Sequence, residues 1–98
     1  MNEKTIQKNI PVFEEHACFP TQMLGNAILN IIASPPSIDD VNVLLSKNMT
    51  PKLQRKFNFT QKDLEKFNNL KNIFNIPYDY QMIYVILNKC QQNPLFKF

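Results

Sequence analysis

One stretch near the amino terminus brings together residue types that act in catalysis. His16 is the only histidine of the chain; it follows Glu14 and Glu15, and Cys18 stands two residues after it. A cysteine–histidine nucleophile needs both side chains within hydrogen-bond reach and an oxyanion site beside them. Residues two apart do not face each other on a helix, and the local sequence lacks the glycines that shape such sites. We therefore expect no catalytic residues and no enzyme, with a small enzyme that uses His16 or Cys18 as the weaker alternative.

The same stretch is a poor metal site. Tetrahedral zinc takes four ligands, usually with two or more cysteines or histidines in register, and Glu15, His16 and Cys18 do not supply that set. Loops that cradle phosphates need several glycines, whereas this chain has one, Gly25. The sequence therefore predicts neither a metal nor a cofactor.

Basic residues gather in the second half of the chain. Residues 1–46 hold two lysines against five acidic residues, whereas residues 47–98 hold nine basic residues against three acidic ones. Such a cluster either binds an anionic partner or is only a solvated surface. Arg55 is the only arginine, and its planar guanidinium can hold a carboxylate or a phosphate through two hydrogen bonds. The candidate partner-binding residues are Lys52, Arg55, Lys56, Phe59, Lys62 and Lys66.

Seven prolines divide the chain into segments of helical length. Proline fixes φ and lacks an N–H, so helices accept it in the first turn and exclude it from the interior. Apolar residues recur with helical spacing over residues 20–33, after a Ser37 cap, and over residues 60–74. Thr50 and Pro51 predict the start of a further short helix that extends to residue 57.

The segment 78–92 is the most ambiguous. Residues 82–87 are rich in β-branched and aromatic types, which suit a buried strand, but the unbroken length of the segment and the lack of a strand partner favour a helix. The sequence predicts an all-α fold, a single compact bundle of four to five short helices. The alternative is α+β, if residues 82–87 form a strand. Residues 1–12 are expected to be a flexible amino-terminal arm and residues 13–98 a single helical domain.

The expected function is that of a non-enzymatic protein–protein interaction module, such as a small adaptor or an inhibitor. The helices predicted at 20–33 and 78–92 are apolar over more than one face, which leaves apolar surface for a partner unless they pack together centrally. The expected partner is another protein, with two alternatives: an acidic protein, or a second copy of this chain in a homodimer. The second choice is a nucleic-acid-binding helical domain that uses the basic 47–71 face. The aromatic tail at residues 95–98 either folds back or is offered to a partner.

The expected location is intracellular, in the cytoplasm or the nucleus. No run of eighteen apolar residues is present, so no membrane-spanning helix is expected. The first sixteen residues lack the apolar core of a signal peptide and the arginines of a transit peptide. Cys18 and Cys90 are too few for a disulfide scaffold, and both are predicted to be reduced and buried.

Overall fold

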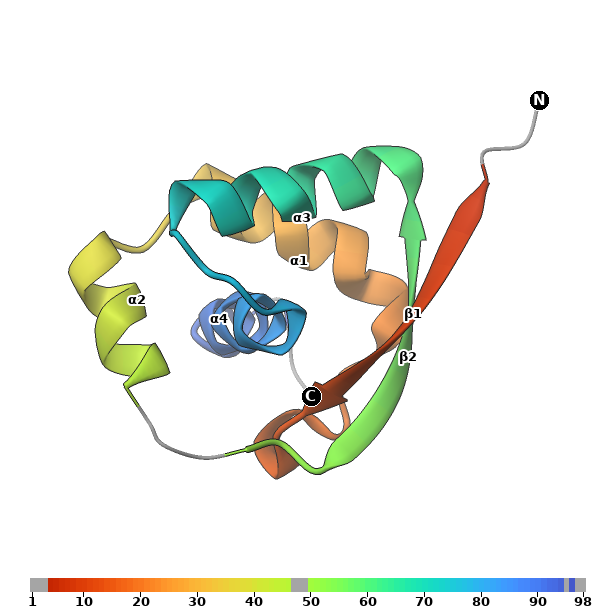
Figure 1. The fold of residues 1–98 in the computed structure, drawn as a ribbon, viewed down its shortest axis with the longest axis horizontal. Helices are drawn as coiled ribbons and strands as arrows, with labels where there is room; N and C mark the ends of the chain where they lie inside the picture. Colours follow the sequence, from red (N-terminus) through yellow and green to blue (C-terminus); the bar gives the residue numbers. More distant parts are fainter. Residues whose placement is uncertain (1–3, 47–49, 95, 97–98) are drawn as a thin grey trace.

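The protein, in a computed structural model, combines four α-helices with a two-stranded antiparallel sheet (Figure 1). The structure describes residues 4–46, 50–94 and 96, and the numbers of helices and strands refer to these residues. The fold is therefore α+β, and the predicted all-α bundle is wrong. The elements are β1 Thr5–Val12, α1 Leu24–Ala33, α2 Ile38–Leu45, β2 Leu53–Thr60, α3 Gln61–Ile73 and α4 Asp79–Gln91, with 3-10 turns at Glu14–His16 and Thr21–Met23.

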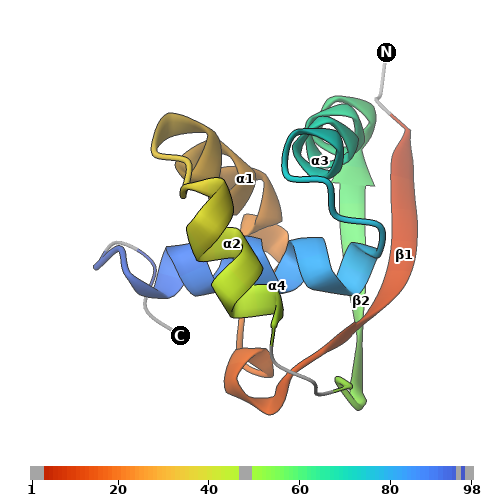
Figure 2. The ribbon, with the colours of Figure 1, turned by 60° about the vertical axis from the view of Figure 1, so that its left-hand side comes forward.

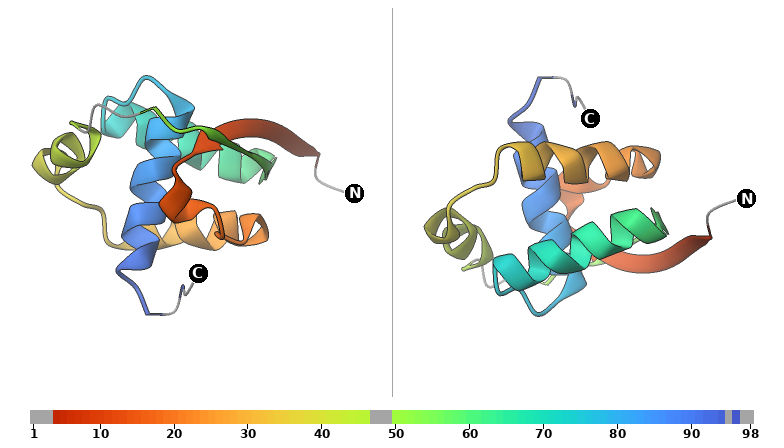
Figure 3. Two further views of the ribbon diagram at one scale, coloured as in Figure 1. Left: turned by 90° about the horizontal axis from the view of Figure 1, so that it is seen from below. Right: turned by 90° about the horizontal axis from the view of Figure 1, so that it is seen from above.

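Helix α4 is the centre of the fold. The six residues from Met82 to Leu87 are all buried, and so is Cys90 one turn later. A helix that is apolar all round has to be enclosed by other elements. Helices α1, α2 and α3 and strand β1 pack around α4 (Figures 1 and 3). The helix predicted in this segment is confirmed, and residues 82–87 do not form the strand that was the alternative.

The sheet is a ribbon in which β1 and β2 pair with Ile10 opposite Arg55. Side chains alternate between the two faces of a strand, so one face of the ribbon meets the helices and the other meets solvent. On the helix-facing side, Ile10, Val12, Phe57 and Phe59 are buried. The ribbon forms one edge of the molecule, with the four helices on one side of it (Figures 1 and 2).

Two predicted segments take a different structure. Residues 5–12, expected to belong to a flexible arm, form β1. Of residues 51–57, expected to be a short helix, residues 53–57 belong to β2. Leu53 and Phe57 are four apart, a spacing that puts two side chains on one face of a helix and equally on one face of a strand. The choice is made by pairing between strands more than 40 residues apart, which no local pattern reports.

Side-chain caps fix where two helices begin. Ser37 Oγ accepts a hydrogen bond from the Asp40 N–H at 3.0 Å, and Thr60 Oγ1 accepts one from the Asp63 N–H at 3.1 Å. These bonds satisfy N–H groups that have no partner inside the first turn of a helix. The predicted starts of α2 and α3 are confirmed.

A tight turn joins α3 to α4. Asn75 adopts a positive φ of 56°, and the Ile76 N–H donates to the Lys71 carbonyl oxygen at 2.8 Å, which closes the end of α3. Asp79, the first residue of α4, accepts from Lys71 Nζ at 2.7 Å and from Lys8 Nζ of β1 at 3.3 Å. One carboxylate therefore ties β1, α3 and α4 together where the helix dipole favours negative charge.

Candidate functional site

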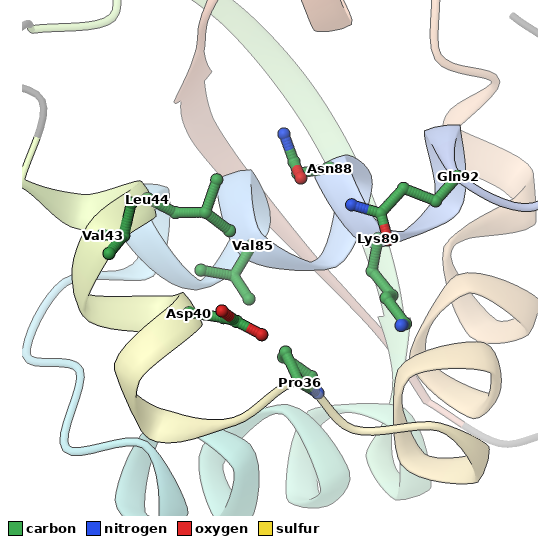
Figure 4. Close-up of a pocket in the computed structure, with 8 residues that line it drawn as sticks. All are labelled: Pro36, Asp40, Val43, Leu44, Val85, Asn88, Lys89 and Gln92. Carbon is green, nitrogen blue, oxygen red and sulfur yellow. The ribbon is translucent and has the colours of Figure 1, made fainter.

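A pocket of about 340 Å³ lies between α2 and α4. Figure 4 shows that Leu44 and Val85 point toward each other across it, while the Asp40 carboxylate and the Lys89 ammonium approach its opening from α2 and from α4. Its lining combines apolar and polar side chains in equal number: Pro36, Val43, Leu44 and Val85 with Asp40, Asn88, Lys89 and Gln92.

Helix α2, which forms one wall of the pocket, is short and has few buried side chains. Val41 is its one fully buried residue, whereas Leu44 and Leu45 are half-buried and Val43 is 69% exposed. The Pro35–Pro36 joint ends α1 and redirects the chain before α2 begins, because proline cannot continue a helix. Helix α2 is thus anchored in the core through Val41, with Leu45 packed against it, while Val43 faces solvent.

Of the seven exposed large apolar side chains in the described residues, five lie on α2 or on the two helices that lead toward it, and the other two are Leu53 and Tyr78. Helices α1 and α3 both run from the ribbon toward α2 (Figures 1 and 3). Leu29 and Ile32, in the later turns of α1, are 50% and 43% exposed, and Ile73, the last residue of α3, is 64% exposed. Ile38 and Val43 of α2 are 58% and 69% exposed. We call these five residues the apolar end.

Arg55 has an intramolecular role. Its Nη2 donates to the Phe19 carbonyl oxygen at 2.9 Å, and its Nη1 donates to the Ala17 carbonyl oxygen. The guanidinium therefore uses its planar fork to hold the 13–20 segment against the inner side of the ribbon. Phe59, expected to be an exposed aromatic, is fully buried and packs edge to face on Phe67 with ring centroids 5.1 Å apart.

The four lysines of the predicted site are spread over two elements. Lys52 is exposed just before β2, and Lys56 is exposed on the solvent face of β2. Lys62 and Lys66 follow on α3. An eight-residue strand spans about 26 Å, so Lys52 and Lys62 lie at opposite ends of the ribbon. The structure does not bring the six predicted residues together on one surface. Lys47, which begins the predicted basic face, lies outside the described residues.

The amino-terminal chemistry is divided between two environments. His16 is 1% exposed and its ring packs on Tyr84 with centroids 5.4 Å apart, whereas Cys18 is exposed. Within residues 4–46, 50–94 and 96, no group of three or more histidine, cysteine, aspartate or glutamate side chains could hold a metal ion. In the same part of the chain, no helix is long and apolar enough to span a bilayer.

Two thiols show opposite burial. Cys90 is fully buried in the core, and burial raises the pKa of its thiol to about 11. Cys18 is exposed, which corrects the prediction that both cysteines are buried, and neither cysteine is in a disulfide. Of the aromatic tail, Phe96 packs against the core, while Leu95 and Phe98 lie outside the described residues.

The second surface of interest is the solvent face of the ribbon. Its eight positions are Thr5, Gln7, Asn9 and Pro11 on β1 and Gln54, Lys56, Asn58 and Thr60 on β2. Sequence reasoning missed this face, although Phe57 and Phe59 alternate with polar residues at the spacing typical of a half-buried strand. A further cavity of about 390 Å³, lined by Phe13, Glu14, Thr50, Pro51, Lys52 and Leu53, lies at one end of the ribbon.

No family model, no curated protein and no solved structure matches this chain.

Proposed function

We propose that this protein is a non-enzymatic interaction module that binds another protein through the pocket between α2 and α4 and the apolar end around it. The observation that carries the proposal is that the pocket is lined by Val43, the most exposed apolar side chain of α2. A pocket that is partly lined by hydrocarbon and has an exposed apolar side chain at its wall is typical of a surface that takes an anchoring side chain from a partner.

The chemistry of the lining indicates what the anchor would be. Val85 and Leu44 present hydrocarbon to the interior of the pocket, and a volume of about 340 Å³ accommodates one large apolar side chain. Asp40 and Lys89 at the opening can bond to the backbone or to polar side chains that flank the anchor. We infer a partner segment with a large apolar residue next to polar neighbours.

The location we propose is inside the cell, in the cytoplasm or the nucleus. Supporting it, Cys18 is exposed and unpaired by any disulfide, as is usual in a reducing compartment.

A display selection from a random peptide library, with the wild-type protein as bait, tests the proposed function. We expect selected peptides to share a large apolar residue and to shift the amide resonances of residues 38–45 and 85–92. Val43→Glu should weaken binding at least about tenfold, because it places a charge beside the pocket without disturbing the core. Leu53→Glu is the matched control, since Leu53 is also exposed but lies on the ribbon.

Three results would overturn the proposal. Peptides whose resonance shifts map outside α2 and α4 would place the binding site elsewhere, and unchanged affinity in the Val43→Glu variant would exclude the pocket. A stable dimer in sedimentation velocity that Val43→Glu dissociates would show that a second copy occupies this surface, rather than a different protein.

A further inference from the structure

The solvent face of the β1–β2 ribbon has an unusual composition. Four of its eight positions are side-chain amides, which we call the ribbon amides: Gln7, Asn9, Gln54 and Asn58. All four are exposed. Lys56 is the one charged residue of the face, and no carboxylate stands among the eight positions. Each amide offers both donors and an acceptor, so the face is a row of hydrogen-bonding groups with a positive centre.

Lysines also stand at the ends of the ribbon. Lys4 directly precedes β1, Lys52 directly precedes β2, and Lys62 is the second residue of α3 after β2. All three are exposed. On the inner side of the ribbon, Lys8 forms an ion pair with Asp79. Free positive charge therefore surrounds the amide face, and the chain as a whole carries a net charge of +3.

The ribbon is held rigidly from behind. Phe57 and Phe59 of β2 and Ile10 and Val12 of β1 anchor its inner side in the core. Arg55 adds hydrogen bonds to the segment that follows β1. Side chains on a fixed scaffold lose less freedom when they bind, which favours recognition by several weak polar contacts.

The dimensions fit the major groove of duplex DNA. A two-stranded ribbon is among the elements that this groove, about 12 Å wide, admits. Eight residues of strand span about 26 Å, the length of roughly eight base pairs. Asparagine and glutamine pair with adenine through two hydrogen bonds, and lysine pairs with guanine. The deep, narrow major groove of an RNA duplex does not admit such side chains.

We propose that the solvent face of the ribbon binds duplex DNA in the major groove, with the ribbon amides and Lys56 at base edges and with Lys52 and Lys62 at phosphates. This surface is separate from the pocket between α2 and α4 and does not depend on the protein-binding function. It also differs from the helical nucleic-acid site expected from the sequence, because residues 53–60 are a strand.

The first test measures affinity and its salt dependence. Fluorescence anisotropy with a labelled 20-base-pair duplex of random sequence, between 50 and 200 mM salt, should give a slope of log association constant against log salt concentration of about −2, from the phosphate contacts of Lys52 and Lys62. The variant Lys52→Ala/Lys62→Ala should make this slope shallower by about 2. An unchanged slope, or the absence of binding at 50 mM salt, would overturn the proposal.

The second test measures base recognition. Selection from a pool of random duplexes should enrich one adenine-containing motif of about eight base pairs. Gln7→Thr/Asn58→Thr keeps strand-forming residues in place and should lower the preference for that motif at least about tenfold without changing the salt slope. Asn68→Ala/Asn72→Ala, which removes exposed amides from α3, is the matched control and should leave the preference intact.

Other outcomes identify other ligands. Equal binding of single strands or of an RNA duplex would overturn major-groove recognition, as would a selection that enriches no motif. The Val43→Glu variant should bind DNA like the wild type. Because that variant tests the pocket and the ribbon variants test the face, failure of one proposal leaves the other measurable.

Discussion

Arg55 and Phe19 are joined across 36 residues of sequence, with Arg55 Nη2 donating to the Phe19 carbonyl oxygen at 2.9 Å. The same guanidinium donates to the carbonyl oxygen of Ala17. Arginine thereby satisfies two backbone acceptors in a segment that has little regular structure. The only arginine of the chain therefore links the ribbon to the 13–20 segment through hydrogen bonds.

Replacement of Arg55 by alanine should lower the free energy of unfolding by about 2–3 kcal/mol, because hydrogen bonds to a charged group are lost and two carbonyls are left without their donor. Urea unfolding followed by circular dichroism measures this. Arg55→Lys should recover only part of the loss, since an ammonium lacks the fork. Lys56→Ala, on the opposite face, should stay within about 0.5 kcal/mol of wild type. Equal losses of unfolding free energy for Arg55→Ala and Lys56→Ala would contradict a stabilising role of the Arg55 hydrogen bonds.

Gly25 lies inside α1 beside Asp63 of α3, and a Cβ at position 25 would come 3.2 Å from Asp63 Oδ2. That oxygen is at the end of a rotatable side chain, so a small shift relieves the contact. Alanine is favoured over glycine in a helix by about 1 kcal/mol. Gly25→Ala should therefore raise the free energy of unfolding by roughly 0.5–1 kcal/mol. In an Asp63→Ala background the gain should reach the full amount, and a loss of stability in both backgrounds would refute the argument.

The two thiols should react at very different rates. Cys18 is exposed, whereas Cys90 is fully buried and burial raises its pKa to about 11, so that the reactive thiolate of Cys90 is scarce at neutral pH. A colorimetric disulfide reagent at pH 8 should titrate one thiol in the native protein and two in denaturant. Cys18→Ser should abolish the native reaction, and persistence of a fast-reacting thiol in that variant would contradict the burial of Cys90.

Asp79 should make the free energy of unfolding depend on pH in the acid range. Burial acts to raise the pKa of this carboxyl, but hydrogen bonds and charge from Lys71, together with Lys8, outweigh burial and hold the pKa below its ordinary value of 3.8. A carboxyl with a lowered pKa stabilises the fold above its ordinary value and loses that effect as pH falls through the folded value.

The expected result is that wild type exceeds Asp79→Asn in unfolding free energy at pH 7 and that this difference shrinks below pH 3.8. Urea unfolding at pH 7, 4 and 2.5 measures it. Glu65→Gln, which changes an exposed carboxyl on α3, controls for general effects of acid. A difference that stays constant over this range would show that Asp79 does not titrate as described.

The candidate sites were accessible to sequence reasoning only in part. Lys56 stands out in the sequence as a basic residue, but its position among exposed amides requires the register that sets Asn9 opposite it. Ile38 belongs to the apolar helical pattern that follows the Ser37 cap and would be expected to face the core, yet it is 58% exposed. The pocket depends on how α2 and α4 sit beside each other, which composition and spacing do not encode locally.

The sequence alone determined the four helices, because their signals are local: caps at Ser37 and Thr60, the Asn75–Ile76–Pro77 stop, and apolar spacing within each segment. Only the tertiary structure decided that residues 5–12 and 53–60 are strands. Residues spaced four apart, such as Leu53 and Phe57, satisfy a strand as well as a helix over so short a segment, and the hydrogen bonds that select the strand come from a partner more than 40 residues away. That one non-local pairing leads to the burial of Phe59, to the hydrogen bonds from Arg55 to the 13–20 segment, and to the amide face of the ribbon.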